Sequence, residues 1–460
     1  MKAFDHELIS GSPARSVWKL AWPLIMLNLV NGVHGLVDHV LVGHFVPDET
    51  KAANAAIGVA WQVFLVLVVF IASLFHGMNV LMARYAGKQD RERMSRVAYE
   101  TFLAAVIALV FIIGPTGYLL APRLLDFVRA EPHVQQYALP YLRILFACGA
   151  PLFLMLMITG AFQASGDPKT PLKLGILTTV LNVVISFVLI TVFDMGTVGA
   201  ALGTVLAPFV TVVVAIALVL RGKMIIHPPA RFHLLPDLRV LKVVVRIGIP
   251  TGIQGVLLNL GGVLLLRYIG SLPGSAAAQA AYTICYSQLF SLVTWTSFGL
   301  RAATGTLSGQ NIGAGKPERA RACVYHAALF GGVWAGAVGL LFWLLPEQLL
   351  ALFDAARGDV LLYGRALLRT LSVSGIFLAT TLAFTGGLQG AGETKMPMYI
   401  AFLTQIVILL GICQALLSLD MLTPNRIWMA ILVSHCARLV MTYGVFRMGA
   451  WTRIKVELEH

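Results

Sequence analysis

Twelve long apolar runs shape this sequence of 460 residues. Each holds about 20 residues or more, which is enough to cross a hydrocarbon core of about 30 Å as a helix. Backbone N–H and C=O groups find no water at that depth, so such runs must be helical. The runs are 20–44, 55–82, 97–120, 138–162, 172–193, 197–220, 243–269, 276–303, 323–345, 366–387, 398–419 and 427–446. The sequence therefore predicts an all-α polytopic membrane protein with twelve transmembrane helices.

The charged residues set the expected orientation. Only 12% of the residues are charged, whereas about a quarter is typical of soluble domains. The net charge is +13, and most Lys and Arg residues outside the runs lie in the two tails and in the connections that follow even-numbered runs. By the positive-inside rule these parts face the cytoplasm. We therefore expect a bacterial-type plasma (inner) membrane protein with both termini inside, which contacts lipid and does not bind nucleic acid.

The two halves of the chain resemble each other. Residues 142–171 match residues 368–397 at a constant offset of 226, and the matches include polar loop residues. Shorter matches between the halves pair Ala86-Gly87-Lys88 with Ala314-Gly315-Lys316, and Pro23 with Pro250. A repeat of six helices keeps both halves in the same orientation, as in transporters that alternate access to a central site. The predicted parts are a six-helix bundle at 1–220, a cytoplasmic linker at 221–242, a second bundle at 243–457, and a tag-like end at 458–460.

Asp38 is the one carboxylate placed deep inside an apolar run. A charge at that depth costs about 2.5–3.5 kcal/mol on insertion scales, so an intramembrane acid is by default a functional hypothesis. A carboxyl group in a low dielectric also takes up a proton more readily than in water. The competing interpretation is an acid that a neighbour neutralises for helix packing.

Several motifs make the chain resemble the multidrug and toxic compound extrusion (MATE) family. They are Gln163-Ala-Ser-Gly-Asp-Pro-Lys-Thr-Pro171, its echo Gln389-Gly-Ala-Gly-Glu-Thr-Lys-Met-Pro397, Gly199-Ala-Ala-Leu-Gly-Thr204, and Pro23 with Gly35-Leu-Val-Asp38. The resemblance covers roughly residues 13 to 450. It implies two six-helix bundles that form a V. It also implies a secondary antiporter that exports amphiphilic, often cationic compounds, driven by inward proton or sodium flow.

The position of the acid is similar to that in the DinF-like branch of the family. In that branch the coupling acid follows a proline of the first helix by fifteen residues, and Pro23 and Asp38 keep this spacing. The NorM-like branch uses acids in the seventh and tenth helices, where this chain has Leu258 and no acid. The branch pairs an asparagine with an aspartate in the fifth helix, and here these positions hold Asn182 and Ser186. Because the second acid is missing, ion coupling is expected to depend on Asp38.

The residues suggest a polar cluster among the first, fifth and sixth helices. His34 and Asp38 are spaced i, i+4 on one helix face, as are Asn182 and Ser186. With Thr204 they form the predicted coupling site, in which protonated Asp38 donates to Asn182 or Thr204. Pro23 is predicted as a helix hinge, with a static kink as the alternative. The expected coupling ion is the proton, with sodium as the alternative, and we expect no metal or other cofactor.

The substrate cavity is predicted from polar, aromatic and methionine side chains, each of which also suits ordinary helix packing. The candidates are Asn31, Met155, Thr178, Gln254, Asn259, Tyr282 and Tyr286. The expected partners are small amphiphilic or cationic substrates, and the expected state is a monomer.

Two other functions were compared with the exporter. A lipid-linked precursor flippase would need cationic residues in its cleft, and Arg143, Arg267, Arg301 and Arg438 read as lying within or at the ends of helices. A membrane enzyme, such as a prenyltransferase, would need clustered acids for Mg²⁺ and diphosphate, and the sequence has none. The favoured prediction is a transporter, not an enzyme.

Overall fold

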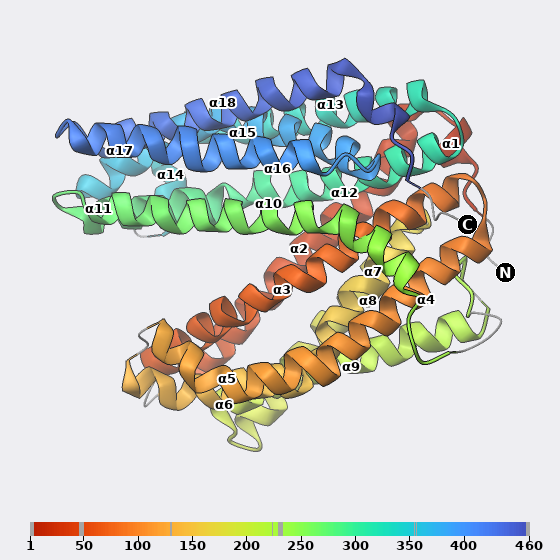
Figure 1. Ribbon diagram of the computed structural model, residues 1–460. Helices are drawn as coiled ribbons and strands as arrows, with labels where there is room; N and C mark the ends of the chain where they lie inside the picture. The colour runs from red at the N-terminus through yellow and green to blue at the C-terminus, as the bar shows by residue number, and fades with distance from the viewer. Residues whose placement is uncertain are drawn as a thin grey trace. The chain divides into compact units, whose positions relative to one another are not determined.

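The computed structural model describes residues 4–45, 50–128, 131–222, 224–228, 233–353, 355 and 357–456. It describes the side chains of these residues except for 33–45, 50–54, 62 and 65–70. Figure 1 shows the helices in chain order, coloured from red at the N-terminus to blue at the C-terminus.

The first half of the chain contains the helices of the first six apolar runs. They are α1 (Glu7–Ser10), α2 (Pro13–Phe45), α3 (Thr50–Gly87), α4 (Arg91–Ile107), η2 (Ala108–Ile113), α5 (Gly114–Phe127), α6 (Pro132–Cys148), α7 (Ala150–Ala164), α8 (Lys169–Thr191) and α9 (Gly196–Leu220). The fourth run is bent by 53° between α6 and α7. The bend falls at Gly149, just before Pro151, whose missing N–H weakens the helix there.

The second half repeats this pattern. Its helices are α10 (Leu238–Gly270), α11 (Ser275–Tyr282), η3 (Thr283–Leu289), α12 (Ser291–Gly313), α13 (Pro317–Leu344), α14 (Pro346–Ala351), α15 (Gly358–Gly390), α16 (Lys395–Ala401), η4 (Phe402–Leu410), α17 (Gly411–Ser418), α18 (Pro424–Met448) and η5 (Ala450–Arg453). Every predicted apolar run lies on one helix or on consecutive helices, to within two residues at its ends. In the described part, eight helices are long and apolar enough to span a membrane, or nine with the bent pair. The all-α membrane fold is confirmed.

Three spans contain π-helical segments, η2, η3 and η4. A π-helical turn inserts an extra residue into the hydrogen-bond pattern and is often found at functional sites. The segment η3 contains Tyr286, and η4 contains Thr404 and Gln405. These three residues recur in the polar cluster of the second half.

Contacts divide the chain into two units that do not follow the two sequence halves. The N unit consists mainly of Met26–Ile249, and the C unit of His6–Ile25 with Pro250–Lys455. The continuous helices α2 and α10 therefore each belong to both units. The division falls two residues after Pro23 in α2 and at Pro250 in α10, the two prolines that the repeat pairs.

The start of α2 belongs to the C unit and the start of α10 belongs to the N unit. Close contacts at glycines hold each of these helix starts in its unit. A Cβ on Gly248 of α10 would stand 1.7 Å from the carbonyl oxygen of Ser73, which lies in α3 of the N unit. In the C unit, a Cβ on Gly299 of α12 would stand 2.6 Å from Cγ1 of Ile25 in α2. Ser73 and Gly299 are 226 residues apart, which is the offset of the sequence repeat. The packing therefore repeats along with the sequence.

The predicted bundle boundaries at 220 and 243 come from the sequence repeat, whereas the units come from contacts. The two divisions differ mainly over residues 6–25 and 243–249. The boundaries stay a prediction about the repeat, and the V-shaped arrangement stays an expectation from the family resemblance.

The end of the 221–242 linker is anchored to α4 inside the N unit. Arg96 Nη2 lies 2.7 Å from Asp237 Oδ2, and the backbone N–H of Asp237 donates to the buried Glu100 at 2.7 Å. Burial alone would raise the pKa of Asp237, but hydrogen bonds and charge from Arg239, together with Arg96, lower it. The carboxylate therefore stays ionised in neutral solution, and the linker end stays fixed.

The N-terminal segment is anchored inside the C unit. Arg319 of α13 donates to the backbone oxygens of Glu7 and Gly11 and, at 3.0 Å, to Ser16 Oγ. Asn311 Nδ2 donates to Leu8 O at 3.2 Å. These bonds engage carbonyls in and just after the short helix α1. The chain before Pro23 is thus fastened to α12 and α13.

Candidate coupling and binding sites

The predicted coupling acid and its partner lie on α2. The backbone at His34 and Asp38 is helical. Both side chains lie outside the described part, as the ranges above state. The coupling roles of Asp38 and His34 therefore stay predictions.

The other three coupling candidates are all fully buried in the N unit. Asn182 and Ser186 lie on α8, and Asn182 Nδ2 stands 3.3 Å from Ser186 Oγ. Thr204 lies on α9 and donates to Ala200 O at 2.9 Å. The predicted i, i+4 pair of the fifth span is thus joined by a hydrogen bond.

Small residues bring α8 and α9 into close contact around this pair. A Cβ on Gly203 would stand 2.0 Å from Ser186 Oγ, so the residue beside Thr204 packs directly on Ser186. Two turns away, Thr178 Oγ1 lies 3.0 Å from Thr211 Oγ1. Small and hydroxyl residues are typical of membrane helix contacts because they permit close approach. Asn182, Ser186 and Thr204 therefore share one helix interface.

One acceptor in this interface has no partner among the described residues. Asn182 Oδ1 is buried and makes no hydrogen bond to any of them, although Asn182 Nδ2 is used. A buried polar atom without a partner costs about 1–3 kcal/mol. Asn182 Oδ1 can only accept, so the missing partner is a donor such as a hydroxyl or a protonated carboxyl group.

The predicted cavity residues of the N unit lie on three helices, α2, α7 and α8. Asn31 is exposed, Met155 is buried in α7, and Thr178 is engaged with Thr211. Pro23 is buried within the continuous α2.

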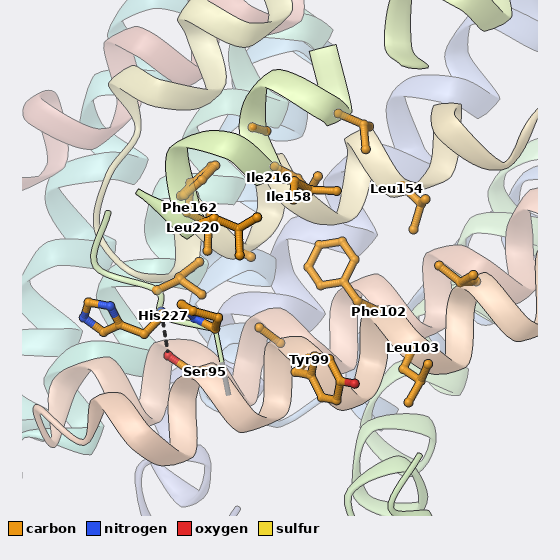
Figure 2. Close-up of a pocket in the computed structure, with 18 residues that line it drawn as sticks. Ser95, Tyr99, Phe102, Leu103, Leu154, Ile158, Phe162, Ile216, Leu220 and His227 are labelled. Carbon is orange, nitrogen blue, oxygen red and sulfur yellow. Dashed lines mark hydrogen bonds between the residues drawn. The ribbon is translucent and has the colours of Figure 1, made fainter. Parts of the chain in front are cut away.

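A cavity of about 350 Å³ lies elsewhere in the N unit, between α4, α7, α9 and residues 226–228. Figure 2 shows Phe102, Ile158 and Leu220 pointing into it, with the backbone N–H of His227 bonded to Ser95 Oγ at 3.1 Å. Its lining is almost wholly apolar, and none of the predicted coupling or cavity residues contributes to it.

In the C unit, Gln254 belongs to a polar chain that the sequence did not reveal. Gln389 Nε2 donates to Gln254 Oε1 at 2.7 Å. The Oε1 atom of Gln389 accepts from Arg301 Nε at 3.0 Å and from Arg301 Nη2 at 2.7 Å. The predicted cavity residue is thus linked, through the repeat motif residue Gln389, to an arginine within α12.

A second arginine lies in the same unit. Arg438 Nε donates to Thr404 Oγ1 at 2.9 Å, and Arg438 Nη2 donates to Gln405 Oε1 at 2.7 Å. Arg301 lies ten residues from the nearer end of α12, and Arg438 lies ten residues from the nearer end of α18. Both thus lie within helices, and neither is among the site residues predicted from the sequence. A lone arginine in an apolar run could have indicated these sites, because it suggests a functional role in the same way as a lone acid.

The two predicted tyrosines are brought together. The rings of Tyr282 and Tyr286 stack at 4.9 Å, and Trp428 continues the stack at 6.1 Å from Tyr282. Asn259 is exposed and bonds its own helix at Gly255 O. Tyr282 and Tyr286 thus form one aromatic group, and Asn259 is separate from it.

Metal ligation has no support in the part of the chain that the structure describes. There, no three His, Cys, Asp or Glu side chains cluster closely enough to hold an ion.

Comparisons with known proteins identify the family. The MatE family model matches residues 23–188 and 250–413, which together exceed half of the chain. A second model, Lipid II flippase MurJ, matches residues 135–269.

Similar proteins match along nearly the whole chain. The probable multidrug resistance protein NorM of Thermotoga maritima is 24% identical and covers 95% of this chain and 92% of its own. Multidrug resistance protein MdtK of Pectobacterium atrosepticum is 24% identical, covering 93% and 94%. A solved MOP superfamily transporter from Pyrococcus furiosus matches with a TM-score of 0.89 at 21% identity, covering 99% and 100%. A solved MATE in complex with MaL6 matches with a TM-score of 0.87 at 22% identity, covering 97% and 99%. The chain therefore belongs to the MatE family and is a membrane transporter of that family rather than an enzyme.

Proposed function

We propose that this chain is a secondary exporter of amphiphilic, often cationic compounds, driven by protons that enter through Asp38. Its relatives are named as multidrug resistance proteins, which supports the substrate class. One charge crossing 100 mV supplies about 2.3 kcal/mol, which is about 50-fold accumulation. Both termini face the cytoplasm in this proposal, in keeping with the distribution of Lys and Arg.

The observation that carries the proposal is Asn182 Oδ1, a buried acceptor that makes no hydrogen bond to a described residue. Leu27 of α2 touches α8 at Gly175, where an added Cβ would stand 2.3 Å from Leu27 Cδ1. Asp38 follows Leu27 by eleven residues, and Ser186 follows Gly175 by eleven. The first and fifth spans run in the same direction, and helices have an equal rise per residue. The backbone of Asp38 is therefore expected at the level of Ser186, one turn from Asn182.

Protonation changes what an aspartate can offer to this acceptor. A protonated carboxyl group donates one hydrogen bond, whereas an ionised one only accepts. Protonated Asp38 thus satisfies Asn182 Oδ1, and ionised Asp38 leaves it open. We propose that this difference biases α2 between two shapes with Pro23 as the hinge, so that proton uptake alters access to the substrate.

Transport by the reconstituted protein tests this function. The measurement uses proteoliposomes in which the outer face of the protein points toward the lumen. A fluorescent amphiphilic cation is expected to accumulate in the lumen only when an inside-acid pH gradient is imposed. A protonophore should return accumulation to the level of protein-free vesicles. Accumulation that ignores both the gradient and the protonophore would contradict the proposal.

Asn182→Leu is expected to shift the pH profile of transport. Without its acceptor, the protonated acid loses a hydrogen bond and releases its proton at lower pH. The pH at which transport is half-maximal should therefore fall by roughly half to one unit. The control is Thr191→Val, which removes a hydroxyl that donates to Phe187 O one turn earlier in the same helix. A lower rate at every pH with an unmoved midpoint would reduce Asn182 to a packing residue.

A lipid-linked precursor flippase is the second candidate. The MurJ model match and the two intramembrane arginines favour it. Such a substrate carries a diphosphate, so its translocation should be independent of Asp38 protonation. Translocation of a labelled lipid-linked diphosphate in proteoliposomes, compared with that of the amphiphilic cation, separates the two functions.

A further inference from the structure

Two guanidinium groups lie inside membrane helices of the C unit without an acid. Arg301 and Arg438 are half-buried, and neither forms an ion pair with a carboxylate in the described part of the chain. Charged groups at that depth are expensive and usually pair with an opposite charge. Here their partners are neutral amides and a hydroxyl, namely Gln389, Gln405 and Thr404. The positive charges are solvated but not neutralised.

Each guanidinium has N–H donors that bond no described residue. Arg301 and Arg438 both use Nε and Nη2, while Nη1 of each makes no hydrogen bond to a described residue. Both side chains are partly exposed, and neither Nη1 is among the fully buried atoms that lack a hydrogen-bond partner. A planar fork with a free edge suits a carboxylate or phosphate oxygen.

The hydrogen-bond networks of the two arginines contact the same face of α10. Gln254, which holds the Arg301 network, and Gly261, on which Gln405 packs, are seven residues apart. Seven residues are two helical turns, or about 10 Å along one face. A Cβ on Gly261 would stand 2.2 Å from Gln405 Cγ, so glycine is what lets the Arg438 network approach.

The Arg438 end combines charge with aromatic surface. Tyr286 lies within electrostatic range of Arg438 and stacks on Tyr282. Thr404 and Gln405 belong to π-helical η4, and Tyr286 belongs to π-helical η3. Two departures from α-helical geometry thus meet at one arginine, as is common at functional sites.

We infer that Arg301 and Arg438 form an anion subsite in the C unit for the carboxylate or phosphate group of an amphiphile. The anionic amphiphile is a transported compound or a membrane lipid. Its flat or apolar part contacts the partly exposed ring of Tyr286, which the buried rings of Tyr282 and Trp428 hold in place. The inference rests on the proposed transport function and narrows it. The compounds bound are then expected to include anionic and zwitterionic amphiphiles beside cationic ones.

Binding to the purified full-length protein tests the subsite without any ion gradient. Three probes share one planar aromatic body and carry a carboxylate, a phosphate or an uncharged amide. In nanodiscs of phosphatidylcholine, calorimetry should show at least about tenfold tighter binding of the two anions than of the amide. Arg438→Gln and Arg301→Gln should each remove about tenfold of the anion affinity and leave the amide affinity unchanged.

The controls separate binding from folding. Arg426→Gln makes the same substitution on α18 at an exposed site and should change nothing. Arg438→Lys keeps the charge and should retain part of the anion preference, even if Arg438→Gln folds poorly. Added phosphatidylglycerol that competes with the anionic probes would assign the subsite to lipid headgroups, and no competition would assign it to transported compounds.

Equal affinity for all three probes, or equal losses for all three in the arginine variants, would overturn the subsite. That result leaves Asp38 coupling untouched, because no gradient is applied. Conversely, failure of proton-driven transport would not alter a measured anion preference.

Discussion

Asp38→Asn is expected to abolish proton-driven export, lowering the initial rate to that of protein-free vesicles. Asparagine has nearly the same shape as aspartate but cannot gain or lose a proton. It is fixed as a donor and acceptor, so it no longer responds to pH. No second membrane acid is available to share the role, since the fifth-span partner is Ser186 and the seventh-span position is Leu258. A chain with a single coupling acid should therefore lose the whole gradient response.

The matched control is Asp194→Asn, in the exposed turn between α8 and α9. Asp194 has a φ of 53°, a conformation that asparagine adopts as readily as aspartate. This variant should transport at the normal rate. Retained, gradient-dependent transport in Asp38→Asn would show that the coupling group lies elsewhere. Calorimetric binding of substrate should persist in Asp38→Asn, because the lost property is coupling.

Gly390→Leu is expected to be the most damaging packing change in the C unit. A Cβ on Gly390 of α15 would stand 2.0 Å from the carbonyl oxygen of Gly305 on α12, and a Cβ on Gly386 would stand 2.2 Å from Arg301 O. These are backbone atoms, which cannot rotate away. Glycines spaced i, i+4 permit such close helix crossings in membranes. Overpacking here should cost about 3 kcal/mol or more.

Thermal unfolding of the purified variants measures this cost. A loss of about 3 kcal/mol corresponds to a fall in Tm of roughly 6 °C or more for a unit of about 200 residues. Gly444→Leu on α18 is the control, because nothing lies within 4 Å of its added Cβ. Similar Tm values for the two variants would mean that the α12–α15 crossing yields easily. The crossing also fixes the backbone of Arg301, so Gly390→Leu should weaken anion binding as well.

Much of the fold follows from the sequence because the membrane leaves little choice. An apolar run of sufficient length must become a helix, so all twelve runs fell on helices. The pairing of Asn182 with Ser186 was also predictable, since four residues make one turn. The π-helical segments η2, η3 and η4 were not predictable, because an inserted residue leaves the hydropathy pattern nearly unchanged.

The exchange of helix starts between the units has no signature in hydropathy. The repeat shows that Pro23 and Pro250 correspond, but only contacts such as Gly248 on Ser73 show where the segments before them belong. Arg301 was missed for a different reason. Its partner Gln389 looked like a loop residue of the repeat motif, and only the packing of α12 on α15 brings the two together.

The central claim is that protons, gathered at Asp38, drive export. The most direct measurement is substrate accumulation in proteoliposomes under proton and sodium gradients imposed separately, with the membrane voltage clamped by potassium and valinomycin. The account predicts accumulation with the pH gradient alone, in the wild type and in Asp194→Asn, and none in Asp38→Asn. Accumulation that follows the sodium gradient at clamped pH, or a pH response that survives Asp38→Asn, would contradict it.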